Sequence, residues 1–321
     1  MDKATGLRLQ HACGCQLAHP GDLFMSKTSD FADHYKVTKG KNFRLKDWDP
    51  TNTNGFDDKD AAEKLLAEGV DRLTKLQDKL YADDSWSLLL IFQAMDAAGK
   101  DGTIKHVMSG INPQGCQVYS FKTPSTEELD HDFLWRTTKC LPERGRIGIF
   151  NRSYYEEVLV VKVHPTYLDR QRMPRKQITK NIWNERYESI NDFEKHISRN
   201  GTIVRKFFLN VSKGEQKERF MKRLDDPARN WKFSSSDVVE RQHWDDYQDA
   251  YQEMIRATAT KHAPWYVVPA DHKWFSRVVV ASAIVDALES LNLDYPIVSE
   301  AKKSELAAAR KMLNAEKKPK A

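Results

Sequence analysis

Short apolar runs alternate with longer amphipathic segments along most of this chain. The run at residues 88–92 is too short and too uniformly apolar for a surface helix, so it predicts a buried central strand. Further strands are predicted at residues 117–121, 146–150, 202–209 and 265–268. Apolar residues at helical spacing predict helices at residues 57–81, 101–109, 125–139, 154–163, 176–199, 212–224, 236–258 and 273–291. This alternation predicts a three-layer α/β fold, in which a mostly parallel sheet has helices on both faces.

The two ends of the chain lack this pattern. Residues 1–40 are expected to form a flexible N-terminal arm, and residues 43–55 carry Pro and Asn-Gly turn signals that predict an extended arm over the surface. Residues 296–321 are basic and poor in large apolar side chains, so they predict a tail with a frayed helix. The expected organisation is therefore one domain over residues 41–295 with an extension at each end.

The stretch from Ser85 to Gly110, SWSLLLIFQAMDAAGKDGTIKHVMSG, has the layout of a phosphate cradle. A buried strand leads into a turn of small residues, and Lys100 opens a helix. Backbone N–H groups and the positive end of the helix then face one point, where they can hold phosphate oxygens beside a lysine. The motif G-x-x-x-x-G-K-[ST] is met only in part, because Ala94 replaces its first glycine and Asp101 its last residue.

Asp96 lies inside this turn, where bound phosphates would repel a carboxylate unless a cation lay between them. The residue therefore argues for Mg²⁺, and an Asx-type turn is the alternative. Asp101 suits the dipole of the helix without any ligand, and Thr103 can be an ordinary helix-face hydroxyl.

A second group, Asn151-Arg152-Ser153, follows the strand at residues 146–150. Side chains at the carboxyl ends of parallel strands meet at one edge of the sheet, so we expect this group to project toward the cradle. Arg152 can bind a phosphate with two N–H groups, and Asn151 is a weaker metal ligand than aspartate. Ser153 is expected mainly to cap the next helix, and Glu156 and Glu157 fit its first turn.

Basic residues cluster in a third region. Seven occur between residues 213 and 232, and they are Lys213, Lys217, Arg219, Lys222, Arg223, Arg229 and Lys232. If residues 210–235 fold over the cradle, they form a lid whose arginines neutralise a transferring phosphoryl group. Nucleic acid would also bind a basic surface, but only Trp231 and Phe233 could stack on bases there, so we expect no nucleic-acid partner.

Composition adds only broad limits. The chain has 321 residues, 40% of them hydrophobic, and a net charge of +5, which suits an anionic ligand without requiring one. No apolar run approaches the roughly 20 residues that span a bilayer, and no secretory signal is visible, so a cytoplasmic protein without membrane contact is expected. Four cysteines are too few and too irregularly spaced for a disulfide framework, and His11, Cys13 and Cys15 lack a fourth zinc ligand.

Three longer blocks resemble the polyphosphate kinase 2 family over roughly residues 40–295. They are FQAMDAAGKDGTIKHVMSGINPQGCQVYSFKTPSTEELDHDFLWR, GIFNRSYYEEVLVVKVHP and RLDDPARNWKFSSSDVVERQHWDDY, and they occur in the order found in that family. The segment QAMDAAGKD is most similar to the sequences of the subgroup, class III, that phosphorylates both AMP and ADP. Asn151 departs from the aspartate found in many members.

The resemblance implies a P-loop kinase fold with a helical lid. It implies transfer of the terminal phosphate of inorganic polyphosphate to AMP and ADP, giving ADP and ATP, in a reaction that is reversible in principle. It further implies Mg²⁺, with Mn²⁺ able to substitute, and a homo-oligomer.

The expected catalytic residues are Asp96, Lys100, Arg152 and Arg223. The expected phosphate- or nucleotide-binding residues are Ala97, Ala98, Gly99, Asp101, Gly102, Thr103, Asn151, Ser153, Glu157 and Arg229. Asp96 and Asn151 are the expected metal ligands. Two alternatives stay open, namely an ATP-dependent nucleoside monophosphate kinase and a non-catalytic protein that binds polyanions or nucleic acid.

Overall fold

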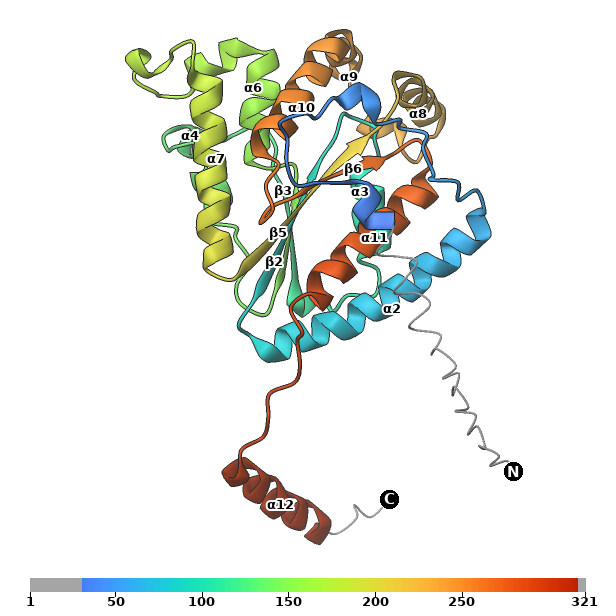
Figure 1. Ribbon diagram of the computed structural model, residues 1–321, viewed down its shortest axis with the longest axis vertical. Helices are drawn as coiled ribbons and strands as arrows, with labels where there is room; N and C mark the ends of the chain where they lie inside the picture. The colour runs from blue at the N-terminus through green and yellow to red at the C-terminus, as the bar shows by residue number, and fades with distance from the viewer. Residues whose placement is uncertain (1–30, 317–321) are drawn as a thin grey trace, which may run out of the picture.

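A six-stranded sheet forms the centre of the protein (Figure 1). The computed structural model describes residues 31–316. Its strands are β1 (Lys36–Val37), β2 (Ser87–Gln93), β3 (Cys116–Ser120), β4 (Ile147–Asn151), β5 (Thr202–Asn210) and β6 (Trp265–Pro269). They lie in the order β1-β6-β5-β2-β4-β3, with β1 antiparallel to β6 and every other pair parallel. The predicted strands are confirmed, with bounds that differ by at most one residue at each end.

Helices cover both faces of this sheet, which confirms the three-layer α/β prediction (Figure 1). One face carries α2 (Lys59–Asp83), α3 (Lys100–Val107) and α11 (Lys273–Glu289), which pack on one another. The other carries α6 (Val160–Val163), α7 (Ile182–Arg199) and α10 (Trp244–Thr258). Because both faces are covered, all seven residues of β2 are buried. The central strand therefore places the loop that follows it at the middle of the carboxyl end of the sheet.

The remaining helical segments connect these layers. The other α-helices of the body are α4 (Thr126–Leu129), α5 (Trp135–Thr138), α8 (Lys213–Asp225) and α9 (Ser235–Glu240). The 3₁₀ turns are η1 (Leu45–Asp47), η2 (Pro113–Gly115), η3 (Tyr154–Val158), η4 (Pro165–Arg170), η5 (Arg175–Gln177), η6 (Asn230–Lys232) and η7 (Arg241–His243).

Several predicted helices are shorter or broken in the structure. The helix expected at 125–139 is α4 and α5, because Asp132 accepts a hydrogen bond from the backbone N–H of Leu134 and makes a separate turn. The helix expected at 154–163 is η3 followed by one turn of α6, with a non-helical residue at Leu159. The helix expected from 176 begins only at Ile182, and the one expected at 236–258 is interrupted by η7.

The N-terminal prediction also needs correction. Residues 31–40, assigned to a flexible arm, enter the domain, because β1 pairs with β6 and Ala32, Tyr35 and Val37 are buried. The segment 43–55 does not simply run over the surface. Phe43 and Leu45 are buried, and the side chain of Arg256 donates to the carbonyl of Phe43 at 2.7 Å. Apolar anchors separated by turns therefore hold this segment on the body.

The C-terminal segment leaves the body. Helix α12 (Glu300–Ala315) has no buried residue and extends away from the layers (Figure 1). The predictions for His11, Cys13 and Cys15 lie outside the described residues. Between residues 31 and 316, no helix is long and apolar enough to cross a membrane.

Candidate active site

The loop between β2 and α3 turns tightly around its own backbone. Gly99 has a φ of 107° and Ala97 a φ of 60°, both in the left-handed region that glycine adopts easily and alanine does not. The Thr103 N–H donates to the Gly99 carbonyl at 2.9 Å, so the helical bonding of α3 starts there. The N–H groups of the residues before it are left without helical acceptors, as at any helix start. This is the expected cradle.

Lys100 folds back over this loop. Its Nζ donates to the carbonyl of Ala94 at 2.8 Å, which places the ammonium inside the turn. Burial lowers the pKa of Lys100, and the Arg152 charge lowers it further, while neighbouring carboxylates oppose the shift. A bound phosphate would replace the missing counter-charge. The backbone carbonyl at Ala94, which any residue at that position would supply, is thus the acceptor that holds the lysine.

The end of β4 forms a second wall of the site. Because β2 and β4 are parallel and pair Phe92 with Asn151, the next residue, Arg152, lies beside the loop. Its Nη2 is 2.9 Å from Oδ1 of Asp96, and the amide nitrogen of Asn151 donates to Asp101 at 2.7 Å. The expected juxtaposition of the two motifs is therefore present.

Arg152 has an unusual backbone and an unusual charge environment. Its φ is 65°, a strained value for a non-glycine residue, and such residues concentrate at functional sites. Glu156 is the largest influence that raises the pKa of Arg152, and Asp96 adds to it. Glu156 in turn accepts a hydrogen bond from Gln93 at 2.9 Å. The guanidinium is thus a fixed positive charge at the cradle.

The lid segment reaches the cradle through α8. The Gln216 side chain donates to the backbone carbonyl of Asp96 at 3.0 Å. Arg223 lies 3.7 Å from Asp237, whose pKa is raised first by burial and then by the charge of Asp96. Asp237 and Arg223 therefore lie on the cradle side of the lid. Arg229 pairs with Asp226 at 3.1 Å and is largely exposed.

The remaining predicted residues lie around the loop in different settings. Asp101 is exposed at the start of α3, Ala98 and Thr103 are buried, and a Cβ added to Gly102 would meet no atom within 4 Å. Space above the first helical turn is thus open. Ser153 is fully buried, and its hydroxyl accepts from the N–H of Tyr155, as expected for a cap.

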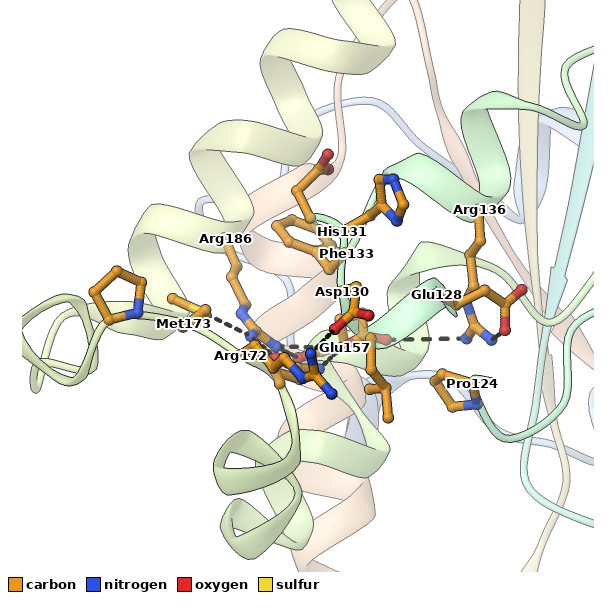
Figure 2. A pocket seen from close by; sticks show the side chains of 14 residues that line it. Pro124, Glu128, Asp130, His131, Phe133, Arg136, Glu157, Arg172, Met173 and Arg186 are labelled. Atoms are coloured by element: carbon orange, nitrogen blue, oxygen red, sulfur yellow. Dashed lines mark hydrogen bonds and ion pairs between the residues drawn. The ribbon is translucent and has the colours of Figure 1, made fainter. Parts of the chain in front are cut away.

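Glu157 lines a separate cavity of about 310 Å³ (Figure 2). Its walls include Pro124, Leu129, Phe133, Met173 and Pro174. Figure 2 shows Glu157 between Arg136 on one side and Arg186 on the other. Arg186 lies 3.5 Å from Oε2, while Arg136 approaches Oε1 only to 3.9 Å, which is too long for a hydrogen bond. Burial raises the pKa of Glu157, and these arginines oppose the shift.

This cavity belongs to the same sheet edge as the cradle. Phe121, directly after β3, donates its N–H to the carbonyl of Asn151 at 3.1 Å, and Arg136 donates to the carbonyl of Lys122 at 2.8 Å. Glu157 itself lies in η3, which begins two residues after Arg152. Apolar walls with a few buried polar groups are typical of small-molecule sites.

Several residues of the site were not selected from the sequence. Gln93 ends a strand, so the strand-end rule could have found it. Glu156 was assigned only to the helix dipole. Gln216 and Asp237 gave no signal, because they reach the cradle from positions more than 100 residues away.

Taken together, the sheet order and the small-residue loop with its lysine define a P-loop phosphotransferase. The polyphosphate kinase 2 family matches residues 56–296. The chain belongs to the polyphosphate kinase 2 family.

Two relatives and one solved structure match this chain over nearly their whole length. The ADP-polyphosphate phosphotransferase of Rhodopseudomonas palustris is 52% identical, across 87% of this chain and 97% of that protein. The AMP/ADP-polyphosphate phosphotransferase of Meiothermus ruber is 43% identical, across 82% of this chain and 94% of that protein. The crystal structure of polyphosphate kinase 2 from Arthrobacter aurescens TC1 has a TM-score of 0.80 and 42% identity, across 88% of this chain and 96% of that one.

Proposed function

We propose that this protein transfers the terminal phosphate of inorganic polyphosphate to AMP and ADP. The observation that carries the proposal is the meeting of Lys100, Arg152 and Asp96 around one phosphate loop. An oxygen of the acceptor phosphate attacks the terminal phosphorus, and the bond to the shortened polyphosphate breaks, leaving the charge on that chain. Because the acceptor is already ionised, no proton must be removed, and positioning with charge neutralisation suffices.

Each group has a role in this proposal. Lys100 and the free N–H groups at the start of α3 hold phosphate oxygens, and Arg152 neutralises the moving phosphoryl group. Arg223 adds a second positive charge from the lid, where its Nη1 lies 3.7 Å from Oδ2 of Asp237. Arg229, at the exposed edge of the lid, binds the incoming polyanion.

We assign a Mg²⁺ ion, with Mn²⁺ as a substitute, to Asp96 and Asn151. Among the described residues, no three His, Cys, Asp or Glu side chains converge on a cation site. Because Mg²⁺ at phosphate-binding sites needs only one or two carboxylates from the protein, Asp96 and the amide oxygen of Asn151 would be sufficient to hold it. The Arg152 contact occupies Oδ1 of Asp96, and no described residue donates to its Oδ2, which is free to bind the ion. When bound, the ion neutralises phosphate charge.

The cavity beside Glu157 is assigned to the nucleoside of the acceptor. Its apolar walls suit a ribose and a base, and Oε1 of Glu157 has capacity to accept an N–H. Leu129→Trp should fill the cavity and raise the KM for AMP at least about tenfold, since apolar and polar contacts of the nucleoside are lost together. The KM for polyphosphate should stay within about twofold. An unchanged KM for AMP would remove the cavity from the nucleotide site.

The central test supplies ADP and polyphosphate without ATP. Formation of ATP supports the proposal, whereas an ATP-dependent nucleoside monophosphate kinase or a mere polyanion-binding protein yields none. Parallel reactions with AMP, GMP and GDP measure acceptor preference. Products that appear only when ATP is added as donor would overturn the assignment.

We place this activity in the cytoplasm and in a homo-oligomer. Both proposals are supported by the resemblance to the family, whose members act on nucleotides. Light scattering of the purified chain measures the number of copies, and a monomer at assay concentration would contradict the second proposal.

A further inference from the structure

Arg219, in the middle of α8, is a buried arginine whose guanidinium lies against backbone carbonyls. Its Nη1 donates to the carbonyl of Ala98 at 2.7 Å and to that of Ala97 at 3.2 Å. Its Nη2 donates to Ala270 at 2.6 Å and Asp271 at 3.1 Å. The guanidinium therefore joins the phosphate loop to the loop that follows β6.

The charge of this arginine is already compensated. Its Nε donates to the carboxylate of Glu215 at 2.7 Å, one helical turn earlier. With Nε, Nη1 and Nη2 all bonded and only 7% of the residue exposed, Arg219 is not placed to contact a phosphate itself. Arg219 can therefore act on transfer only through the groups that it holds.

Two of the carbonyls that Arg219 holds, those of Ala97 and Ala98, belong to the cradle. In a trans peptide the C=O and the following N–H point in opposite directions. Turning the Ala98 carbonyl toward Arg219 therefore turns the N–H of Gly99 away from it, on the side where a phosphate would lie. Gly99 has a φ of 107°, in the left-handed region that glycine adopts easily. A Cβ built on Gly99 would have Nη1 of Arg219 as its single neighbour within 4 Å, at 3.8 Å.

The same contacts connect the cradle with the start of the lid. The carboxylate of Asp271 accepts from the N–H of Ser212 at 2.8 Å, and Ser212 caps α8. The loop after β6, the phosphate loop and α8 thus form one hydrogen-bonded cluster. Only Arg219 contacts all three through a single planar group, among the described residues.

We propose that Arg219 is a positioning residue that sets the orientation of the phosphate-loop peptides for transfer. The inference rests on the proposed function, because it concerns the same site. A flexible lysine carries the same charge but cannot bridge these carbonyls with a rigid fork. A shift of about 1 Å in a reacting group can cost about 10²-fold in rate.

The test compares Arg219→Lys and Arg219→Gln with Lys222→Gln. Lys222 lies on the same helix, and its side chain is largely exposed and 3.4 Å from Glu218, so its loss removes one charge without touching the loop. We expect both Arg219 variants to lose about 10- to 100-fold in kcat for ADP with polyphosphate, measured well below their melting temperatures. The Lys222 variant should stay within about twofold.

The Arg219→Lys variant distinguishes positioning of the loop from an effect of charge or helix stability alone. Wild-type kcat in a folded Arg219→Lys protein would overturn the proposal, because charge or helix stability alone would then explain the residue. If the Arg219 variants do not fold, Glu215→Gln keeps the arginine and loosens one contact. It should lower kcat severalfold, and an unchanged kcat would again overturn the proposal. A wild-type protein without polyphosphate-dependent transfer would instead refute the proposed function.

Discussion

The surroundings of Lys100 at the cradle disfavour its positive charge, because burial and the charge of Arg152 both lower its pKa. Lys100 is desolvated beside Arg152, and both cations lie near Asp96. Such perturbed groups concentrate at functional sites because a ligand completes their charge balance.

Lys100→Ala and Asp96→Ala should each abolish transfer, with a loss of at least about 10³-fold in kcat/KM, since each removes a charge that acts on phosphoryl groups. Steady-state ATP formation from ADP and polyphosphate measures the loss. Circular dichroism should show an intact fold.

A matched control exists on the same helix. Lys105 is exposed on α3, so Lys105→Ala removes a lysine away from the loop and should keep near wild-type rates. Undiminished turnover in purified Lys100→Ala protein would contradict the assignment of the cradle.

Cys116, in the edge strand β3, predicts a pH dependence of stability. Burial raises the pKa of its thiol from 9.0 to about 11. A group whose pKa is raised on folding contributes stability that is complete below its unfolded pKa and is lost as pH rises through its folded pKa. The free energy of unfolding of the wild type should therefore fall between pH 9 and about pH 11 more steeply than that of Cys116→Val. Urea titrations at several pH values compare them, and parallel curves would contradict this account.

At the scale of elements, a buried ion pair holds the segment that follows Arg152. Lys206 on β5 and Glu194 on α7 are both fully buried and lie 2.6 Å apart. Tyr154 and Tyr155 donate to Glu194 at 2.9 and 2.7 Å. The network thus fixes η3, and with it the backbone just after the strained Arg152, against the sheet.

Removing one partner of this pair should be strongly destabilising. Glu194→Ala leaves Lys206 buried and unpaired and should cost about 3–5 kcal/mol in the free energy of unfolding. Replacing both as Glu194→Leu with Lys206→Met should cost less, because no charge stays uncompensated. Denaturant unfolding measures both, and a double variant less stable than the single one would contradict the argument.

At the scale of the whole molecule, the C-terminal helix contributes little to the body. A chain ending at Ser299 should unfold within about 0.5 kcal/mol of the full chain and keep its kcat, because every residue of α12 is exposed. Thermal unfolding and the transfer assay check this.

A longer truncation from the same end is a useful control. A chain that stops before α11 loses twelve buried residues of that helix and should not fold. A large loss of stability on removing α12 alone would indicate that it packs against another copy.

The fold was largely predictable because its signals are local. Strand lengths, helical spacing and the small-residue turn before Lys100 are properties of neighbouring residues, and the structure places them as expected. Predictions failed where a helix was interrupted by side-chain hydrogen bonding, as at Asp132, or where a turn-rich segment is held by distant partners, as at Phe43. The hydrogen bond at Asp132 is local but competes with helical bonding, whereas the contact of Arg256 with Phe43 depends on tertiary packing.

The sequence by itself therefore determined the class of the protein and located the candidate phosphate loop, since a strand, a turn of small residues with a glycine, and a lysine occur in one continuous stretch. Only the tertiary structure decided how that loop is supported. Arg152 reaches Asp96 because β4 pairs with β2, and Arg219 reaches Ala98 because α8 folds over the loop. These contacts join residues that are 56 and 121 positions apart. They follow from how the whole chain packs, and no local pattern encodes them.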